Sequence, residues 1–146
     1  MSNITFKQLE KSSQGDRYDW QDLKSQIKFD ADGLIPAIAQ QYDSKEVLMM
    51  AWMNEKSLQE TLETGRVCYW SRSRQNYWRK GEESGQIQTL KELRFDCDGD
   101  AILVLVDQTG PACHTGRRSC FYTLVDKEHA EITSDPLIDP ATLYKK

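Results

Sequence analysis

The chain has no apolar run long enough to cross a membrane, which takes about 20 residues. Its longest apolar runs, 47–53 and 102–106, are far shorter. The first residues, Met-Ser-Asn-Ile-Thr-Phe-Lys, contain neither an apolar core nor a small-residue cleavage site, so we expect no secretory signal. These absences predict a cytoplasmic protein without a membrane partner.

Basic residues are not in excess either. The 19 lysines and arginines are outnumbered by 23 acidic residues, and the net charge is −4. Because sequence-independent binding of nucleic acid needs a net basic surface, we expect no nucleic-acid partner. The length of 146 residues predicts a single domain, and 38% hydrophobic residues place it among globular proteins rather than disordered ones.

Cysteines are few, and their spacing is not that of a structural zinc motif. The four cysteines are Cys68, Cys97, Cys113 and Cys120. None of them forms a CxxC pair, which excludes a zinc ribbon or finger. In a reducing compartment we expect no disulfides. Cys68 lies within a predicted strand, so we expect it in the core.

Hydrophobic periodicity divides the chain into three parts. Residues 1–28 are a polar N-terminal extension with one predicted helix at 20–27, residues 29–127 form the domain, and residues 128–146 read as a C-terminal tail. The strands are predicted at 34–39, 47–53, 67–70, 86–95, 101–106 and 119–125. Pro36 favours an edge position for the first strand. One helix is predicted at 55–64, because Asn54 is a favoured N-cap and Gly65 a favoured helix end.

An acidic triplet precedes the strand at 101–106. In an extended segment alternate side chains share a face, so Asp96, Asp98 and Asp100 are expected to converge. Three like charges on one face favour a bound cation, and oxygen ligands suit Mg²⁺ or Ca²⁺. An EF-hand is excluded because Ala101 replaces its glycine, Asp107 its final glutamate and a strand its second helix. A polar turn without a metal is the alternative.

A glycine-containing loop carries two cysteines and a histidine. Cys113 and Cys120 are separated by six residues, and His114 follows the first of them. If Cys97 joined them, three thiolates would leave an open fourth position, as in catalytic zinc sites. Alternatively, the cysteines are small hydrophobes packed in the core. His114, beside a possible metal thiolate, is the candidate general base.

A basic and aromatic stretch, 66–80, contains five positive charges and no acid. Its arginines and serines suit phosphate, and its aromatic rings can stack on a base or pack in the core. A solvated basic face is the alternative. The pattern favours a small phosphorylated ligand with a planar ring. The candidate substrate-binding residues are Trp70, Ser71, Arg72, Ser73, Arg74, Trp78, Lys80, Arg117 and Arg118.

Together these segments resemble one enzyme family. The motifs are Trp-Ser-Arg-Ser-Arg at 70–74, Trp-Arg-Lys-Gly at 78–81, Asp-Cys-Asp-Gly-Asp at 96–100 and Gly-Pro-Ala-Cys-His-Thr-Gly-Arg-Arg-Ser-Cys-Phe at 110–121. They resemble phosphoribosyl-AMP cyclohydrolase of histidine biosynthesis, and the likeness runs from about Leu34 to Tyr122. Bifunctional members of that family carry a second, pyrophosphohydrolase domain, whereas this chain stops at Lys146, so we expect the monofunctional form. The segments before and after the likeness match no pattern that the sequence reveals.

The resemblance implies a fold, an activity and two metals. The fold is α+β and mainly β, a compact, twisted, barrel-like sheet with few helices, in an intertwined homodimer. The activity is hydrolysis of the N1–C6 bond of the adenine ring of phosphoribosyl-AMP, the third step of histidine biosynthesis, in the EC 3.5.4 class. One Zn²⁺ per subunit is bound by Cys97 of one chain and Cys113 and Cys120 of the other. One Mg²⁺ per subunit is bound by Asp96, Asp98 and Asp100.

The implied mechanism uses a zinc-activated water that attacks C6, which N1-ribosylation has made electrophilic. His114 transfers the protons, and the arginines of the two basic segments hold the phosphates.

Two other classes of protein predict different features. A zinc-stabilised RNA-binding module needs four ligands in one chain, for which adjacent Cys113 and His114 are poorly placed. A base deaminase needs H-x-E and P-C-x-x-C motifs, which are missing.

Overall fold

A computed structural model describes residues 4–143 of the chain. Its helices are α1 (Phe6–Leu9), α2 (Trp20–Lys24), α3 (Glu55–Thr64) and α4 (Pro140–Leu143). Its strands are β1 (Ile35–Gln41), β2 (Val47–Met53), β3 (Cys68–Ser71), β4 (Asn76–Arg79), β5 (Gln88–Phe95), β6 (Ile102–Gln108), β7 (Thr123–Val125) and β8 (Ala130–Ile132). Among the described residues, no helix combines the length and apolar character that a membrane span requires.

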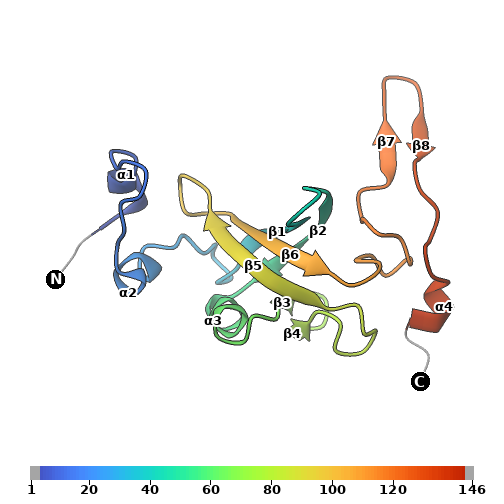
Figure 1. Cartoon of the computed structure of the whole chain (residues 1–146), viewed down its shortest axis with the longest axis horizontal. Helices are drawn as coiled ribbons and strands as arrows, with labels where there is room; N and C mark the ends of the chain where they lie inside the picture. The colour runs from blue at the N-terminus through green and yellow to red at the C-terminus, as the bar shows by residue number, and fades with distance from the viewer. Residues whose placement is uncertain (1–3, 144–146) are drawn as a thin grey trace.

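Six strands form one curled sheet in the order β4-β3-β2-β1-β6-β5 (Figure 1). β1 and β6 are parallel, and the other neighbours are antiparallel. A bridge between Arg66 and Thr89 links the residues before β3 to β5, so the sheet curls back toward its own first edge. This half-barrel with few helices confirms the predicted mainly β fold.

The first strand is central, whereas Pro36 predicted an edge. β1 pairs with β2 on one side and with β6 on the other. Pro36 is tolerated because the ladder with β6 begins only at Ala37, so the missing N–H lies outside that ladder. The prediction was wrong because the proline is the second residue of the strand, ahead of its doubly paired part.

Helix α3 covers part of the sheet and begins and ends as predicted. The Asn54 side chain accepts the Ser57 N–H, and Gly65 ends the helix in the left-handed region at φ 74°. Leu58 and Thr61 are buried against the sheet, whereas Leu62 is 40% exposed. α3 contacts β2 and β3, so its packing stabilises the strands that lead into the basic segment.

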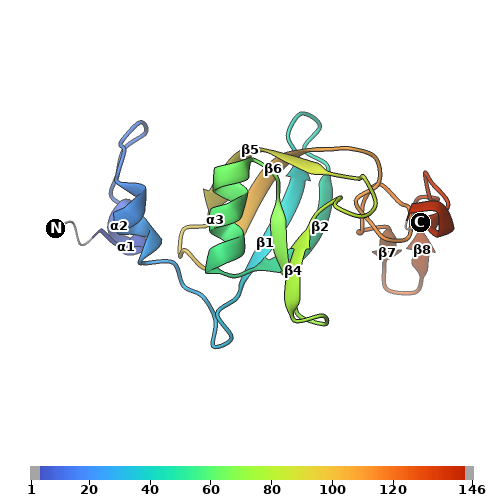
Figure 2. The ribbon, with the colours of Figure 1, turned by 90° about the horizontal axis from the view of Figure 1, so that it is seen from below.

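The two terminal segments lie at opposite ends of the sheet (Figures 1 and 2). The N-terminal segment contains α1 and α2, and its Phe6 and Ile27 join the hydrophobic core. The C-terminal segment contains β8, which pairs with β7, and then α4. The predicted strand at 119–125 is therefore strand only at 123–125, and the predicted tail contains regular structure.

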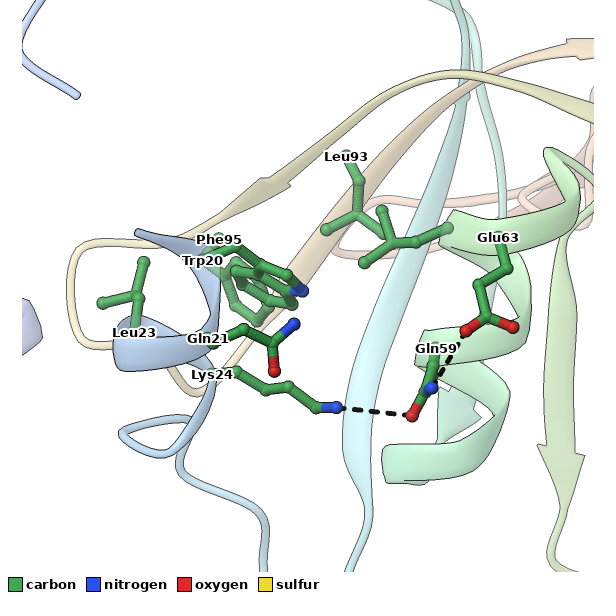
Figure 3. A pocket seen from close by; sticks show the side chains of 9 residues that line it. Trp20, Gln21, Leu23, Lys24, Gln59, Glu63, Leu93 and Phe95 are labelled. Carbon is green, nitrogen blue, oxygen red and sulfur yellow. Dashed lines mark hydrogen bonds between the residues drawn. The ribbon is translucent and has the colours of Figure 1, made fainter. Parts of the chain in front are cut away.

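Helix α2 is held against the body of the molecule across a largely apolar pocket of about 520 Å³ (Figure 3). Trp20 and Leu23 of α2 line one side, and Leu93 and Phe95 of β5 line another. At the rim, the Lys24 ammonium donates to the Gln59 side chain of α3 over 3.3 Å. The N-terminal segment is thus packed onto the sheet rather than loosely attached to it.

Candidate functional site

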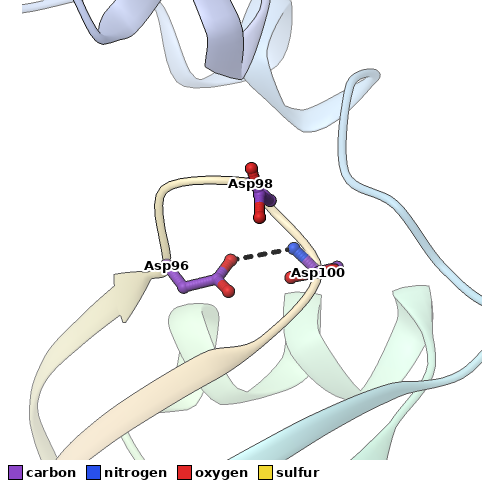
Figure 4. Close-up of side chains that lie close together, drawn as sticks. All are labelled: Asp96, Asp98 and Asp100. Atoms are coloured by element: carbon purple, nitrogen blue, oxygen red, sulfur yellow. Dashed lines mark hydrogen bonds between the residues drawn. The ribbon is translucent and has the colours of Figure 1, made fainter.

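The three aspartates of the acidic triplet converge in the turn between β5 and β6 (Figure 4). One carboxylate oxygen of each of Asp96, Asp98 and Asp100 lies within 4.8 Å of the others. The segment is a tight turn rather than the extended strand that the sequence predicted. The Gly99 N–H donates to the Asp96 carbonyl at 3.1 Å, and Gly99 has φ 72°. The convergence therefore comes from the turn and not from strand alternation.

Hydrogen bonds set the charges in this turn. Slight burial would raise the pKa of Asp96, but the Asp100 and Gly99 N–H groups among others stabilise its charge and lower it. The pKa of Asp100 is raised, first by its hydrogen bond with the Asp96 carboxyl and then by burial and by the nearby charges of Asp96 and Asp98. Three crowded carboxylates of this kind fit a hard divalent cation such as Mg²⁺.

Two of the four cysteines come together in the loop after β6. The Cys113 N–H donates to the Arg117 carbonyl at 3.1 Å, and the Gly116 N–H donates back to the Cys113 carbonyl at 3.0 Å. The Cys120 N–H donates to the Leu48 carbonyl of β2 at 2.7 Å. The two thiols that these bonds position are close enough for each to shift the pKa of the other.

The two thiols differ in acidity. Burial acts to raise the pKa of Cys113, but hydrogen bonds from Thr115, whose hydroxyl lies 3.2 Å from the sulfur, outweigh it and lower that pKa. Burial and the neighbouring Cys113 raise the pKa of Cys120 to about 12. Two neighbouring cysteine sulfurs are a donor pair that suits zinc, which binds the deprotonated form of both.

Cys97 is not brought to this pair. It lies exposed in the acidic turn, before β6, whereas Cys113 and Cys120 follow β6. A strand of this length spans about 20 Å. In residues 4–143, the only group of three metal-ligating side chains that converge is the acidic triplet. The third predicted zinc ligand is therefore at the other end of the sheet within one chain.

A cleft of about 350 Å³ brings several predicted residues together. His114 from the cysteine loop, Arg74 from the β3–β4 turn and Trp78 from β4 line it with Ser71 and Ser73. The β3–β4 hairpin forms one wall of the cleft. Its second strand was not predicted from the sequence. The cleft is thus built from the basic segment and the cysteine loop, as their predicted joint role requires.

The cleft also contains residues that the sequence analysis missed. Tyr77 and Arg79 come from β4, and Glu82, Glu83 and Ser84 come from the turn that follows Gly81. A methyl group on Gly81 would overlap the Ile87 backbone, so this turn is tightly packed. The signal available in the sequence was the alternation of side chains along β4, which would have identified the neighbours of Trp78 as part of a strand. No pattern pointed to the two glutamates.

Trp70 and Arg72 lie outside this cleft. The Arg72 guanidinium lies 4.5 Å from the centre of the Trp52 ring, and Trp70 contacts the Tyr77 ring edge-on at 5.0 Å. Both residues line an open depression beside Asn54 and Asp32. A role for them in substrate binding stays a prediction.

The remaining three basic candidates are Lys80, which lies beside the cysteine loop, and Arg117 and Arg118, which belong to it. Lys80 is 6% exposed, and its ammonium lies 5.3 Å from the centre of the Trp78 ring. Burial lowers the pKa of Lys80, while the nearby Cys120 and Cys113 act to raise it, so Lys80 stands close to both thiols. The Arg117 side chain donates to the Ser134 carbonyl at 2.7 Å.

The Arg118 side chain is hydrogen-bonded to other groups of the same chain. Its guanidinium donates to the carbonyls of Gln108 and Gly110 at 2.8 and 2.7 Å and to the Gln41 side chain at 2.9 Å. These bonds fix the start of the cysteine loop against β1 and β6. The geometry supports a positioning role for Arg118, and its predicted contact with phosphate stays a prediction.

Comparisons with known proteins identify the family to which this chain belongs. The family model described as phosphoribosyl-AMP cyclohydrolase matches residues 49–122, which include β3, the acidic turn and the cysteine loop. A protein of that name from Hydrogenovibrio crunogenus is 76% identical over 143 residues, covering 98% of this chain and 97% of the relative. One from Alkalilimnicola ehrlichii is 62% identical over 141 residues, covering 97% and 99%.

The likeness also includes both terminal segments, which showed no recognisable pattern in the sequence. The Halorhodospira halophila protein of the same name is 59% identical over 95% of this chain and 98% of its own length. The chain thus covers nearly the full length of relatives that are named for the cyclohydrolase activity alone, which is consistent with the predicted monofunctional form. The chain therefore belongs to the phosphoribosyl-AMP cyclohydrolase family of hydrolases.

Proposed function

We propose that the protein hydrolyses the N1–C6 bond of the adenine ring of phosphoribosyl-AMP and yields the phosphoribosylformimino-AICAR ribotide of histidine biosynthesis. The observation that carries this proposal is the cleft that His114, the residue after Cys113 in the chain, lines together with Arg74 and Trp78. It combines a group that can transfer protons, a cation that can bind phosphate and an aromatic ring, and His114 belongs to the loop that carries the two proposed zinc ligands. A phosphorylated purine needs all of these.

One zinc ion per subunit would be held by Cys113 and Cys120, with Cys97 of the partner subunit as the third ligand. When bound, zinc supplies a water whose pKa is lowered toward 7. The donor set fits, because two cysteines are adjacent, one is already acidified, and Cys97 is exposed and accessible to a second chain.

A homodimer that intertwines follows from this ligand set. The third thiol lies at the opposite end of β6, so one chain alone does not complete the site. Apolar side chains on the β7–β8 hairpin support association: Leu124, Val125 and Ile132 are 57%, 68% and 55% exposed. An isolated two-stranded hairpin is marginally stable in water, which favours a partner for it.

The chain's own residues account for the proton movements. Ribosylation of N1 leaves the ring electron-poor, so water adds to C6. His114 takes one proton from that water and delivers it to the exocyclic nitrogen on C6, which is an imine in the N1-substituted ring. The proton of the resulting hydroxyl then moves through His114 to N1 as the N1–C6 bond breaks, so that C6 becomes the carbon of a carboxamide. Trp78 packs along the ring, while Arg74, Ser71 and Ser73 bind a 5′-phosphate through charge-assisted hydrogen bonds.

One Mg²⁺ per subunit would be held by Asp96, Asp98 and Asp100. The carboxylate oxygens are near enough to one another to contact a single ion, and Mg²⁺ in such sites often also binds a substrate phosphate. In a dimer that brings Cys97 to the partner's cysteine pair, the acidic turn reaches the partner's cleft with it. The second 5′-phosphate of the substrate is the group that this metal would orient.

The test is turnover of phosphoribosyl-AMP, followed by ultraviolet absorbance, on protein stripped of metal and then supplied with Zn²⁺ and Mg²⁺. Ring opening that disappears with chelator and returns with zinc is the expected result. No ring opening by the fully metallated protein would contradict the proposal. In that case a zinc-binding module with an RNA ligand becomes the reading to test.

A further inference from the structure

The N-terminal segment packs directly onto the acidic turn, although it lies outside the part of the chain that the family model matches. We propose that α1 and the residues through Lys28 brace this turn and thereby position Asp96, Asp98 and Asp100 for a divalent cation. The inference rests on the proposed function in one respect, namely that the turn binds Mg²⁺. It assigns a role to the segment that the sequence left without one.

The main contact is between Phe6 and Gly99. Phe6 is only 6% exposed, and its ring covers Gly99 so closely that a methyl group at that position would overlap it. Gly99 lies between Asp98 and Asp100 and has φ 72°, a conformation in which glycine is favoured. Both the backbone angle and the Phe6 ring therefore require glycine at the centre of the acidic turn.

A second contact holds the backbone of the same residue. The Lys28 N–H donates to the Gly99 carbonyl at 2.9 Å. This bond comes from outside the turn, whereas the other bonds of Gly99 and Asp100 are made to Asp96 within it. The carbonyl between the second and third carboxylates is thus fixed by the N-terminal segment.

Aromatic packing extends the brace to the end of β5. Phe95, the residue before the triplet, has its ring centre 5.7 Å from that of Phe6 and 5.7 Å from that of Trp20 of α2 (Figure 3). α1 and α2 therefore meet on Phe95. Both helices contact the strand end from which the acidic turn departs.

Support of the turn by the N-terminal segment matters because the like charges within the turn act to push its carboxylates apart. Three adjacent carboxylates repel one another, and Mg²⁺ demands near-octahedral geometry from its ligands. A helix as short as α1, four residues, is not stable alone in water, so its order depends on this packing. The coupling is reciprocal: a brace that favours Mg²⁺ binding is itself stabilised when Mg²⁺ binds.

The experiment compares Phe6→Ala with Leu143→Ala in the full-length zinc-loaded protein. Leu143 is also buried, at 7% exposure, but belongs to α4 at the far end of the molecule. Mg²⁺ affinity is measured by calorimetry, and amide hydrogen exchange is measured for residues 96–101. For Phe6→Ala we expect about tenfold weaker Mg²⁺ binding, the lower end of the loss when support of a ligand is removed, and faster exchange in the turn. Leu143→Ala should change neither.

The outcomes separate the inference from the proposed function. Unchanged Mg²⁺ affinity and exchange in folded Phe6→Ala would overturn the inference, as would equal losses in Leu143→Ala. If Phe6→Ala fails to fold, Phe6→Leu carries the test, with an expected loss of about twofold to threefold in Mg²⁺ affinity. If Mg²⁺ binds wild type and Asp98→Asn equally, the proposed metal site is wrong. Faster exchange of the turn in Phe6→Ala would then still support the brace.

Discussion

The two ends of β6 carry the two candidate metal-binding groups, and they are built differently. Before the strand, three carboxylates lie in one turn of five residues, and the N-terminal segment packs on it through Phe6. After the strand, Cys113 and Cys120 lie in a loop that the C-terminal segment covers, since the Leu137 N–H donates to the Gly116 carbonyl at 2.8 Å. Each terminal segment thus supports one of the two sites.

The two candidate sites differ in whether one chain contains all of the proposed ligands. The acidic turn contains all three carboxylates of the proposed Mg²⁺ site, so a single chain can form it. The cysteine loop contains two sulfurs of the proposed zinc site, and the third, Cys97, lies in the acidic turn at the other end of the strand. A site that is complete within one chain should tolerate dilution to monomers, whereas a site divided between two chains should not. The following predictions exploit this contrast, from the largest expected effect to the smallest.

Cys113→Ser should lower turnover at least about 10³-fold and remove zinc, because the proposed zinc site, which would supply the activated water, loses one of its ligands. The matched control is Cys68→Ala. Burial raises the pKa of Cys68 to about 12, so that thiol is inert, and its loss should affect stability alone. Zinc content by elemental analysis and turnover are the measurements. Full zinc occupancy in Cys113→Ser would contradict the assignment, and Mg²⁺ binding at the other end should be unaffected.

Arg118→Ala should lower the free energy of unfolding by about 3 kcal/mol, because two backbone carbonyls lose a charged donor. Urea unfolding of the zinc-free protein measures this effect without any contribution from the metal. Arg117→Ala is the control, since its guanidinium makes one exposed bond to the Ser134 carbonyl, and its loss should cost less than about 1 kcal/mol. Equal stability of both variants would show that Arg118 does not fix the cysteine loop.

Arg74→Gln should raise KM about tenfold with little change in kcat, because it removes a charged contact to substrate phosphate from the cleft. Arg72→Gln tests the other candidate arginine of the same turn, and its effect on KM should be smaller because Arg72 lies over Trp52 outside the cleft. Steady-state kinetics at saturating metal distinguish the two. An unchanged KM for Arg74→Gln would exclude the phosphate contact, and a larger effect at Arg72 would move the phosphate site to the other face of the hairpin.

Glu60→Gln should have the smallest effect, about 0.5 kcal/mol in stability, because the Glu60–Arg79 ion pair is partly exposed. The Arg79 hydrogen bond lowers the pKa of Glu60 below its ordinary 4.5. The pair therefore contributes fully above that ordinary value, and its contribution is lost as pH falls through the lowered value. Urea unfolding at neutral and acidic pH should show a difference from wild type that disappears in acid. A difference that grows in acid would contradict this sign.

The sequence predicted local chemistry better than long-range placement. Asp96, Asp98 and Asp100 are neighbours in the chain, so any compact turn brings them together, and their convergence was correctly predicted although the backbone was not. The capping of α3 by Asn54 and Gly65 is equally local. Pro36 misled because its effect depends on where the ladder with β6 begins, which only the tertiary structure sets.

Contacts between residues far apart in the chain could not be predicted from the sequence, because they too depend on the tertiary structure. Arg118 pairs with acceptors from β1, β6 and the loop itself, and no pattern near Arg118 distinguishes that role from binding a phosphate. Glu82 and Glu83 enter the cleft because Gly81 packs against Ile87, a contact that has no local signature. The packing of Phe6 on Gly99 likewise joins residues far apart in the chain.

The most direct test of the divided zinc site is complementation between Cys97→Ser and Cys113→Ser, each inactive alone. Half of the dimers formed by random mixing contain one chain of each kind, and each such dimer has one intact site of two. The account predicts recovery to about a quarter of wild-type turnover when the two variants are co-expressed or refolded together. A mixture as inactive as its separate components would contradict it, because a site formed within one chain cannot be restored by a second.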